Sequence, residues 1–173
     1  MEIKAELLKP YTENERMDFI VEQNHKNGYT IEETDNALLA WGLADEEILE
    51  QAKIEKHAEN TAKAKIAVEN GHVVFKGAEF ETNAQTVGDL TATMLLMQAG
   101  GVETYLWLSK DDQTIELSLA DFGTLGGLIA GFKNAIWQEK YLAFKTAIEQ
   151  AETLETVENI VIEYNNSKEV ENE

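Results

Sequence analysis

The longest periodic stretch of the chain runs from Ser118 to Gln150 and contains no proline. Its apolar residues return every three or four positions, which is the period of an α-helix and not that of a strand. One stripe comprises Leu119, Phe122, Leu125, Ile129, Phe132 and Ile136, and an adjacent stripe comprises Trp137, Tyr141, Phe144 and Ile148. Ser118 followed by Asp121 resembles a capping box that begins the helix. We therefore expect a long core helix here, with glycines that allow either a bend or the close approach of another backbone.

Hairpins and helices alternate before this stretch. The segments HVVF and AEFET flank Lys76 and Gly77, which predicts a tight hairpin. A helix follows, whose stripe comprises Val87, Leu90, Met94 and Met97. VETYLWLS and QTIELS then alternate as two strands, and we expect Trp107 to be buried with Phe122, Ile129 and Phe132. After the long helix, the pattern indicates a short helix from Thr153 and a strand over residues 161–164.

The first 44 residues give a less definite pattern. Residues 1–10 form an entry segment that ends at Pro10, and Thr12 with Glu15 is a capping box for a short helix closed by Gly28. Residues 29–43 leave two interpretations open: two strands around an Asp35–Asn36 turn, or a second short helix over residues 35–41.

Residues 45–70 predict a long polar helix, with acids in its first turn and lysines later. Its apolar stripe is sparse and consists of alanines and isoleucines: Ile48, Ala52, Ile54, Ala58, Ala62 and Ile66. So narrow a face stabilises an isolated helix poorly. This pattern is compatible with a solvated connecting helix, with self-association, or with an arm that lies on a partner. We favour the last two, in which the helix takes part in assembly.

Together these elements predict an α+β protein, in which a small antiparallel sheet of hairpins packs against a long core helix. Three regions are expected: an N-terminal helical arm for assembly over residues 1–70, a compact α+β domain over residues 71–165, and an acidic flexible tail over residues 166–173.

Charge changes the range of possible partners. The net charge is −19 and Arg16 is the only arginine, so binding to nucleic acid or to an anionic membrane surface is not expected. There is no cysteine, which excludes disulfides and thiolate chemistry. The apolar runs are short and the first ten residues resemble no signal peptide, so we expect a soluble protein.

Candidate chemistry is sparse. The three histidines are far apart in sequence, and neither HExxH nor the acidic loop of a calcium site occurs. Asp111 and Asp112 suit a turn better than a metal, and the cluster GTLGGLIAG lacks the GxxxxGKS/T pattern of a phosphate loop. We therefore expect no catalytic residues, no cofactor and no metal, and we take Trp41, beside Gly42, as an exposed recognition aromatic.

Four segments carry a resemblance to known proteins: VVFKGAEFETNAQT, YLWLS with its DD turn, SLADF and KTAIEQAETLETVENI. In this order they resemble an uncharacterised domain family that occurs in tail-region proteins of bacteriophages and prophages, often beside tail-fibre genes. The stretch RMDFIVEQNHKNGYTIEETDNALLAWG is similar to the openings of small tail-associated proteins from such elements. The resemblance implies a role in the structure or assembly of the virion tail, and it transfers no functional residue.

The resulting prediction is a non-enzymatic protein of a phage or prophage tail, which acts in tail-fibre assembly or as a minor structural component. It would bind a tail fibre, another tail protein or a second copy, in the host cytoplasm during assembly or in the virion tail. The predicted partner-binding residues are Trp41, Ile48, Ala52, Ala58, Ala62 and Ile66. The alternative is an acidic, host-directed modulator that binds a basic protein; one form of it is a DNA mimic, which requires a continuous acidic ridge.

Overall fold

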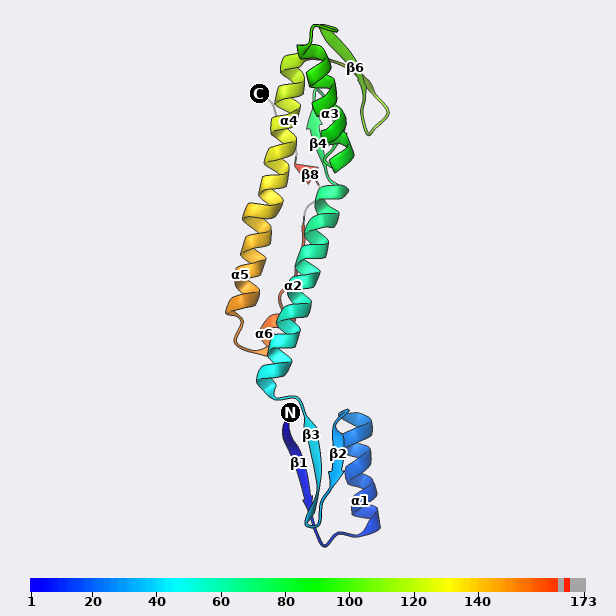
Figure 1. The fold of residues 1–173 in the computed structure, drawn as a ribbon, viewed down its shortest axis with the longest axis vertical. Coiled ribbons are helices and arrows are strands. Elements are labelled where there is room, and N and C mark those ends of the chain that lie inside the picture. The colour runs from blue at the N-terminus through cyan, green and yellow to red at the C-terminus, as the bar shows by residue number, and fades with distance from the viewer. Residues whose placement is uncertain (165–166, 169–173) are drawn as a thin grey trace. The chain divides into compact units, whose positions relative to one another are not determined.

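The computed structural model describes residues 1–164 and 167–168, and it contains two compact units, Met1–Ala52 and Lys53–Glu173 (Figure 1). We call them unit 1 and unit 2. The division falls inside one helix, α2 (Asp45–Glu69). None of the described helices is long and apolar enough to cross a membrane.

Unit 1 contains a three-stranded antiparallel sheet in the order β1-β3-β2. The strands are β1 (Glu2–Leu8), β2 (Thr30–Glu33) and β3 (Ala37–Gly42). Helix α1 (Glu13–Ile20) continues into the π-helical segment η1 (Val21–Lys26), and it begins at the predicted capping box of Thr12 and Glu15. Gly28 ends this helical stretch with a φ of 73°, a left-handed conformation that glycine adopts without strain.

Strands occupy two parts of the region that the sequence predicted to be helical. Residues 29–43 follow the two-strand interpretation, with Ala37, Leu38 and Ala40 of β3 buried. The entry segment is strand β1, in which Ile3, Ala5 and Leu7 alternate with charged residues. Pairing with β3 satisfies backbone groups that an isolated seven-residue segment would leave to water, and this long-range pairing decides the structure.

Unit 2 begins with the rest of α2 and continues with a tight hairpin of β4 (His72–Phe75) and β5 (Ala78–Glu81). Lys76 and Gly77 both have positive φ, as a two-residue turn with the strand twist requires, so the predicted hairpin is confirmed. Helix α3 (Ala84–Gln98) precedes a second hairpin, β6 (Thr104–Leu108) and β7 (Thr114–Ser118).

The chain then forms a continuous helical stretch, from α4 (Leu119–Asn134) through the π-helical segment η2 (Ala135–Tyr141) to α5 (Leu142–Gln150). Helix α6 (Leu154–Glu158) follows. Residues 161–164 are not a strand, contrary to the prediction; Ser167–Lys168 form the short strand β8, which pairs in parallel with β4. The rest of the predicted acidic tail over residues 166–173 lies outside the described residues.

The core of unit 2 lies where the long helix, α2, α3 and the two hairpins meet. Its buried side chains are those of Ala64, Ala67, Val73, Phe75, Ala78, Phe80, Leu90, Met97, Leu117, Phe122, Leu125, Ile129, Phe132 and Ile136. Burial of Phe122, Ile129 and Phe132 was predicted, and Trp107 is half-buried with its ring 5.5 Å from that of Phe122. The protein is thus α+β, with small sheets packed against a long helix, as the sequence predicted.

The irregularity of the long helix lies in η2 and not at the glycines. In α4 the buried residues follow the α-helical spacing up to Ile136, and the next residues packed against the core are Trp137 and Tyr141, one and five positions later. A π-helical turn accommodates one extra residue, so beyond it the residues that face the core come one position later in the sequence than in a regular α-helix. This accounts for the two stripes in the sequence. The Tyr141 carbonyl accepts a hydrogen bond from Asn60 Nδ2 at 3.2 Å.

Residues 53–69 of α2 pack within unit 2. Asn60, Ala64 and Ala67 are buried, and Lys63 Nζ donates to the Ile162 carbonyl at 3.0 Å. The compact unit therefore begins near Lys53, not after the predicted boundary at residue 70. The reason is that a polar side chain, Asn60, occupies the centre of the buried face, which an apolar stripe does not reveal.

Candidate functional site

The predicted contact residues of α2 only partly share one exposed face. Ala58, Ala62 and Ile66 lie with Ile54 at four-residue intervals, and all four are exposed; the exposed fraction is 61% for Ile54 and 56% for Ile66. We call these four residues the α2 face. Ile48 and Ala52 are half-buried and belong to unit 1.

Trp41 lies on β3 and is half-buried, so the expectation of an exposed aromatic is only partly met. Its indole Nε1 donates a hydrogen bond to Glu32 Oε2 at 2.8 Å, across the β2–β3 pair. A partner that used the indole N–H would have to replace this bond.

A second apolar surface, which sequence reasoning did not identify, surrounds strand β6. The rings of Tyr105 and Trp107 lie 6.5 and 5.5 Å from the ring of Phe122, so the residues between and after them face the other way. Leu106 and Leu108 are accordingly 66% and 64% exposed. The alternation in β6 indicates that Leu106 and Leu108 share one face of the strand. Because both faces are apolar, it does not indicate which of them is exposed.

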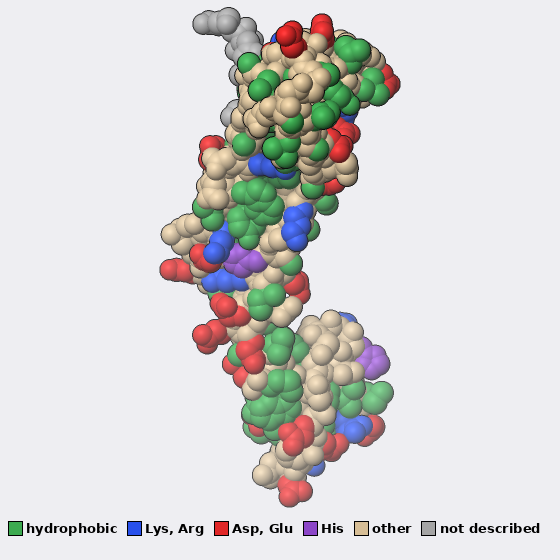
Figure 2. Space-filling view, turned by 45° about the horizontal axis from the view of Figure 1, so that its top comes forward, with side chains coloured by type: hydrophobic (Ala, Val, Ile, Leu, Met, Phe, Trp, Pro, Cys, Tyr) green, Lys and Arg blue, Asp and Glu red, His purple; other side chains and the backbone are tan. Residues whose placement is uncertain are grey.

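Three further aliphatic side chains are exposed just before β6. We call the five residues the hairpin surface: Leu95, Leu96, Val102, Leu106 and Leu108. The end of α3, the following loop and β6 lie at the same end of unit 2 (Figure 1). Figure 2 shows hydrophobic side chains over this end of the unit, which is turned toward the viewer there.

The turn of the β6–β7 hairpin is fixed by polar contacts. Ser109 Oγ donates to Asp111 Oδ1 at 2.6 Å, and the Glu79 amide donates to the same oxygen at 3.1 Å. Chiefly through the Ser109 hydroxyl, these bonds hold the pKa of Asp111 below its ordinary value. Lys110 N also donates to the Glu79 carbonyl at 2.8 Å, which ties the turn to β5. Asp111 therefore acts as a turn residue that positions the hairpin.

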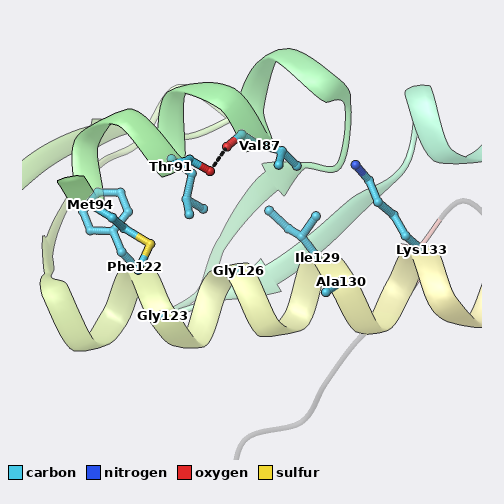
Figure 3. A pocket seen from close by; sticks show the side chains of 10 residues that line it. Val87, Thr91, Met94, Phe122, Gly123, Gly126, Ile129, Ala130 and Lys133 are labelled. Atoms are coloured by element: carbon cyan, nitrogen blue, oxygen red, sulfur yellow. Dashed lines mark hydrogen bonds between the residues drawn. The ribbon is translucent and has the colours of Figure 1, made fainter.

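A cavity of about 360 Å³ lies between α3 and α4 (Figure 3). We call it the α3–α4 groove. Its lining comprises Val87, Leu90, Thr91 and Met94 from α3, and Phe122, Gly123, Gly126, Ile129, Ala130 and Lys133 from α4. A Cβ at Gly123 would meet no atom within 4 Å, and one at Gly126 would lie 3.7 Å from Leu90 Cδ2. These glycines leave open the space that side chains would otherwise fill.

These features describe a small α+β domain with two exposed apolar surfaces and one apolar groove. The family described as "Domain of unknown function (DUF4376)" matches residues 51–164, about two thirds of the chain, so the protein belongs to this family. The match begins two residues before unit 2 does. No curated protein and no solved structure matches the chain.

Proposed function

We propose that the protein is a non-enzymatic, tail-associated protein of a bacteriophage or prophage, which acts through protein–protein contacts in tail-fibre assembly or as a minor tail component. The phage context rests on the resemblance of the four quoted segments. The contact role is supported by one structural observation above the others, the hairpin surface of unit 2.

The hairpin surface has the properties of a protein-binding surface. Exposed aliphatic groups gathered at one end of a unit are unfavourable in water and commonly mark contacts with other proteins. Strand β6 has the sequence TYLWL, with neither a charge nor a proline to discourage pairing at its edge. Among the described residues it has one strand neighbour, β7, so its other edge can accept a strand from a partner.

The α2 face is the second candidate contact. It offers two exposed isoleucines separated by two alanines, which allow close approach of another helix. It has less aliphatic surface than the hairpin surface, so we assign it the smaller part of the binding energy. Trp41, Ile48 and Ala52 remain predicted contacts of unit 1.

An acidic DNA mimic would need a continuous ridge of carboxylates. On the face shown in Figure 2, the acidic side chains of unit 2 occur in small separate groups between hydrophobic and basic ones. This face therefore supports the tail-associated function better than mimicry.

The test uses the phage or prophage that carries the gene. Deletion of the gene is expected to reduce the number of virions with complete tail fibres, counted by electron microscopy, and with it the plaque yield. Mass spectrometry of purified virions then separates the two roles, because a structural component is found in the virion and an assembly factor only in the lysate.

Two variants connect the phenotype to the structure. Leu106→Lys with Leu108→Lys is expected to reproduce most of the deletion, because charged groups replace the aliphatic contact. Ile54→Lys with Ile66→Lys, a matched pair of changes on the α2 face, is expected to have a smaller effect. Normal tails and normal infectivity in the deletion strain would contradict the proposed function.

A further inference from the structure

We propose that the α3–α4 groove binds a small apolar carboxylate, a fatty acid of medium chain length. The alkyl chain would lie along the groove, and the carboxylate would pair with the ammonium group of Lys133. This site is separate from the hairpin surface and the α2 face, and it does not depend on a role in a phage tail.

The shape and lining of the groove suit an alkyl chain. Its volume of about 360 Å³ lies within the usual range for small-molecule sites, and one wall consists of Val87, Leu90 and Met94. Phe122 and Ile129 form the other wall, and the missing side chains at the two glycines leave the space between. A methylene chain makes dispersion contacts with such walls and requires no hydrogen bond.

The polar groups of the lining specify the other end of the ligand. Thr91 Oγ1 donates its hydrogen to the Val87 carbonyl at 2.8 Å, within its own helix (Figure 3). The ammonium group of Lys133 is the remaining side-chain donor, and its side chain points from α4 toward the end of the groove (Figure 3).

Lys133 is half-buried and has no carboxylate partner within 4.0 Å among the described residues; Lys140 shares both properties, but Lys133 alone of the two lines the groove. A partly desolvated ammonium group without a counter-ion is unfavourable, and a ligand carboxylate would supply the missing charge. One cation at one end of an apolar groove thus favours a ligand with one terminal anion and no other polar group.

The binding experiment uses the full chain, labelled with ¹³C at the methionine methyl groups, and decanoate below its micelle concentration. Met94 lines the groove, while Met1 and Met17 belong to unit 1 and serve as internal controls. Decanoate is expected to shift the Met94 signal in a saturable way and to leave Met1 and Met17 unchanged. Decanol, which has the chain without the charge, is expected to bind roughly tenfold more weakly.

Variants of the lysine test the charge. Lys133→Gln is expected to lower the affinity for decanoate roughly tenfold and to leave the affinity for decanol unchanged, whereas Lys133→Arg retains most of the affinity. Lys140→Gln is the matched control, since Lys140 is also half-buried, lies in η2 and is outside the groove lining. It is expected to bind decanoate like the unmodified protein.

Variants of the glycines test the cavity. Gly126→Leu places a side chain into the groove and is expected to abolish the Met94 shift. Gly127→Leu is the control, because Gly127 lies on the same helix outside the groove lining, with open space around its Cβ position. Both changes raise helix propensity, so both proteins are expected to unfold at a higher denaturant concentration, and loss of binding in only one cannot be attributed to unfolding.

Three results would overturn the proposal. The first is the absence of a Met94 shift at saturating decanoate. The second is equal binding of decanoate and decanol, unaffected by Lys133→Gln. The third is a Met94 signal that changes with protein concentration together with a doubled mass in light scattering, which would identify a second copy of the chain as the occupant.

Discussion

Unit 1 and unit 2 are stabilised by different interactions. Unit 1 buries the apolar side chains of Ala37, Leu38 and Ala40 from one strand, and much of its remaining structure is backbone pairing and surface contacts between charged groups. Unit 2 has a core cluster of fourteen buried residues, four of them phenylalanines. Because burial of apolar area is the dominant favourable term in folding, unit 2 is expected to be the more stable of the two.

The charged contacts of unit 1 illustrate the difference. Glu33 accepts a hydrogen bond from the Tyr11 hydroxyl at 2.7 Å and pairs with Arg16 at 3.1 Å. The Tyr11 hydroxyl, followed by Arg16, lowers the pKa of Glu33. Such exposed contacts fix the positions of side chains but contribute little free energy. The comparison therefore predicts that the units respond differently to core truncation, to acid and to salt.

The largest effect is expected in the core of unit 2. Phe132→Ala removes a buried ring that packs so closely on Gly71 that a Cβ there would lie 2.6 Å from it. The expected loss in the free energy of unfolding is about 3–5 kcal/mol, measured by chemical denaturation. Amide hydrogen exchange should show the loss in unit 2, and a loss below about 1 kcal/mol would contradict the burial of this face.

Leu38→Ala is the corresponding change in unit 1. The side chain is fully buried, and its removal is expected to cost about 2–4 kcal/mol, somewhat less because a small unit can relax around the cavity. Amide exchange in β1, β2 and β3 should accelerate while exchange in α4 stays constant. Equal acceleration in both units would show that they unfold together and that the comparison fails.

Acid is expected to weaken unit 2 at the start of α4. The ammonium group of Lys76, 2.7 Å away, and then Ser118 lower the pKa of Asp121 to about 2. The ionised form is therefore favoured in the folded state, so its stabilisation is complete above the ordinary pKa of 3.8 and is lost as the pH falls toward 2. Asp121→Asn should remove this part of the pH dependence of unfolding, and an unchanged acid profile would exclude the contact.

Salt is expected to have the smallest effect, and it should act on unit 1. Arg16→Gln removes the ion pairs with Glu33 and Glu13, which should slightly accelerate amide exchange in unit 1 at low ionic strength. The difference should vanish near 1 M salt, where the Debye length is about 3 Å. Lys145→Gln, which removes an (i, i+4) pair in unit 2, is the control and should leave unit 1 unchanged.

The elements of unit 2 could be predicted because their signals are local. The turn at Lys76 and Gly77, the capping box at Ser118 and the spacing of the α4 stripe each lie within a few residues. The sheet of unit 1 could not be predicted in the same way. Strand β1 pairs with β3, about thirty residues later, and its seven residues alternate without a strongly apolar face.

The candidate sites, too, could be predicted only as far as local sequence patterns reach. On α2 the sequence indicated an apolar stripe, but the face that packs in unit 2 centres on Asn60, which finds partners in Tyr141 and Tyr164. The outward face then includes Ile54 and Ile66. On β6 both faces are apolar, so alternation alone does not determine which one is buried; the aromatic contacts with Phe122 do.

The π-helical segment η2 determines which face of α5 points toward the core of unit 2. If the stretch from Ile136 to Tyr141 became a regular α-helix at unchanged length, the step of five positions would turn α5 by about 100° relative to its present orientation on α4. Ile148 would leave its buried position, and Phe144 would lose its ring contact with Tyr164. Deletion of one residue from η2 together with a change to regular α-helix would instead keep Tyr141 and Ile148 on the inward face, so the extra residue and the π-helical turn depend on each other.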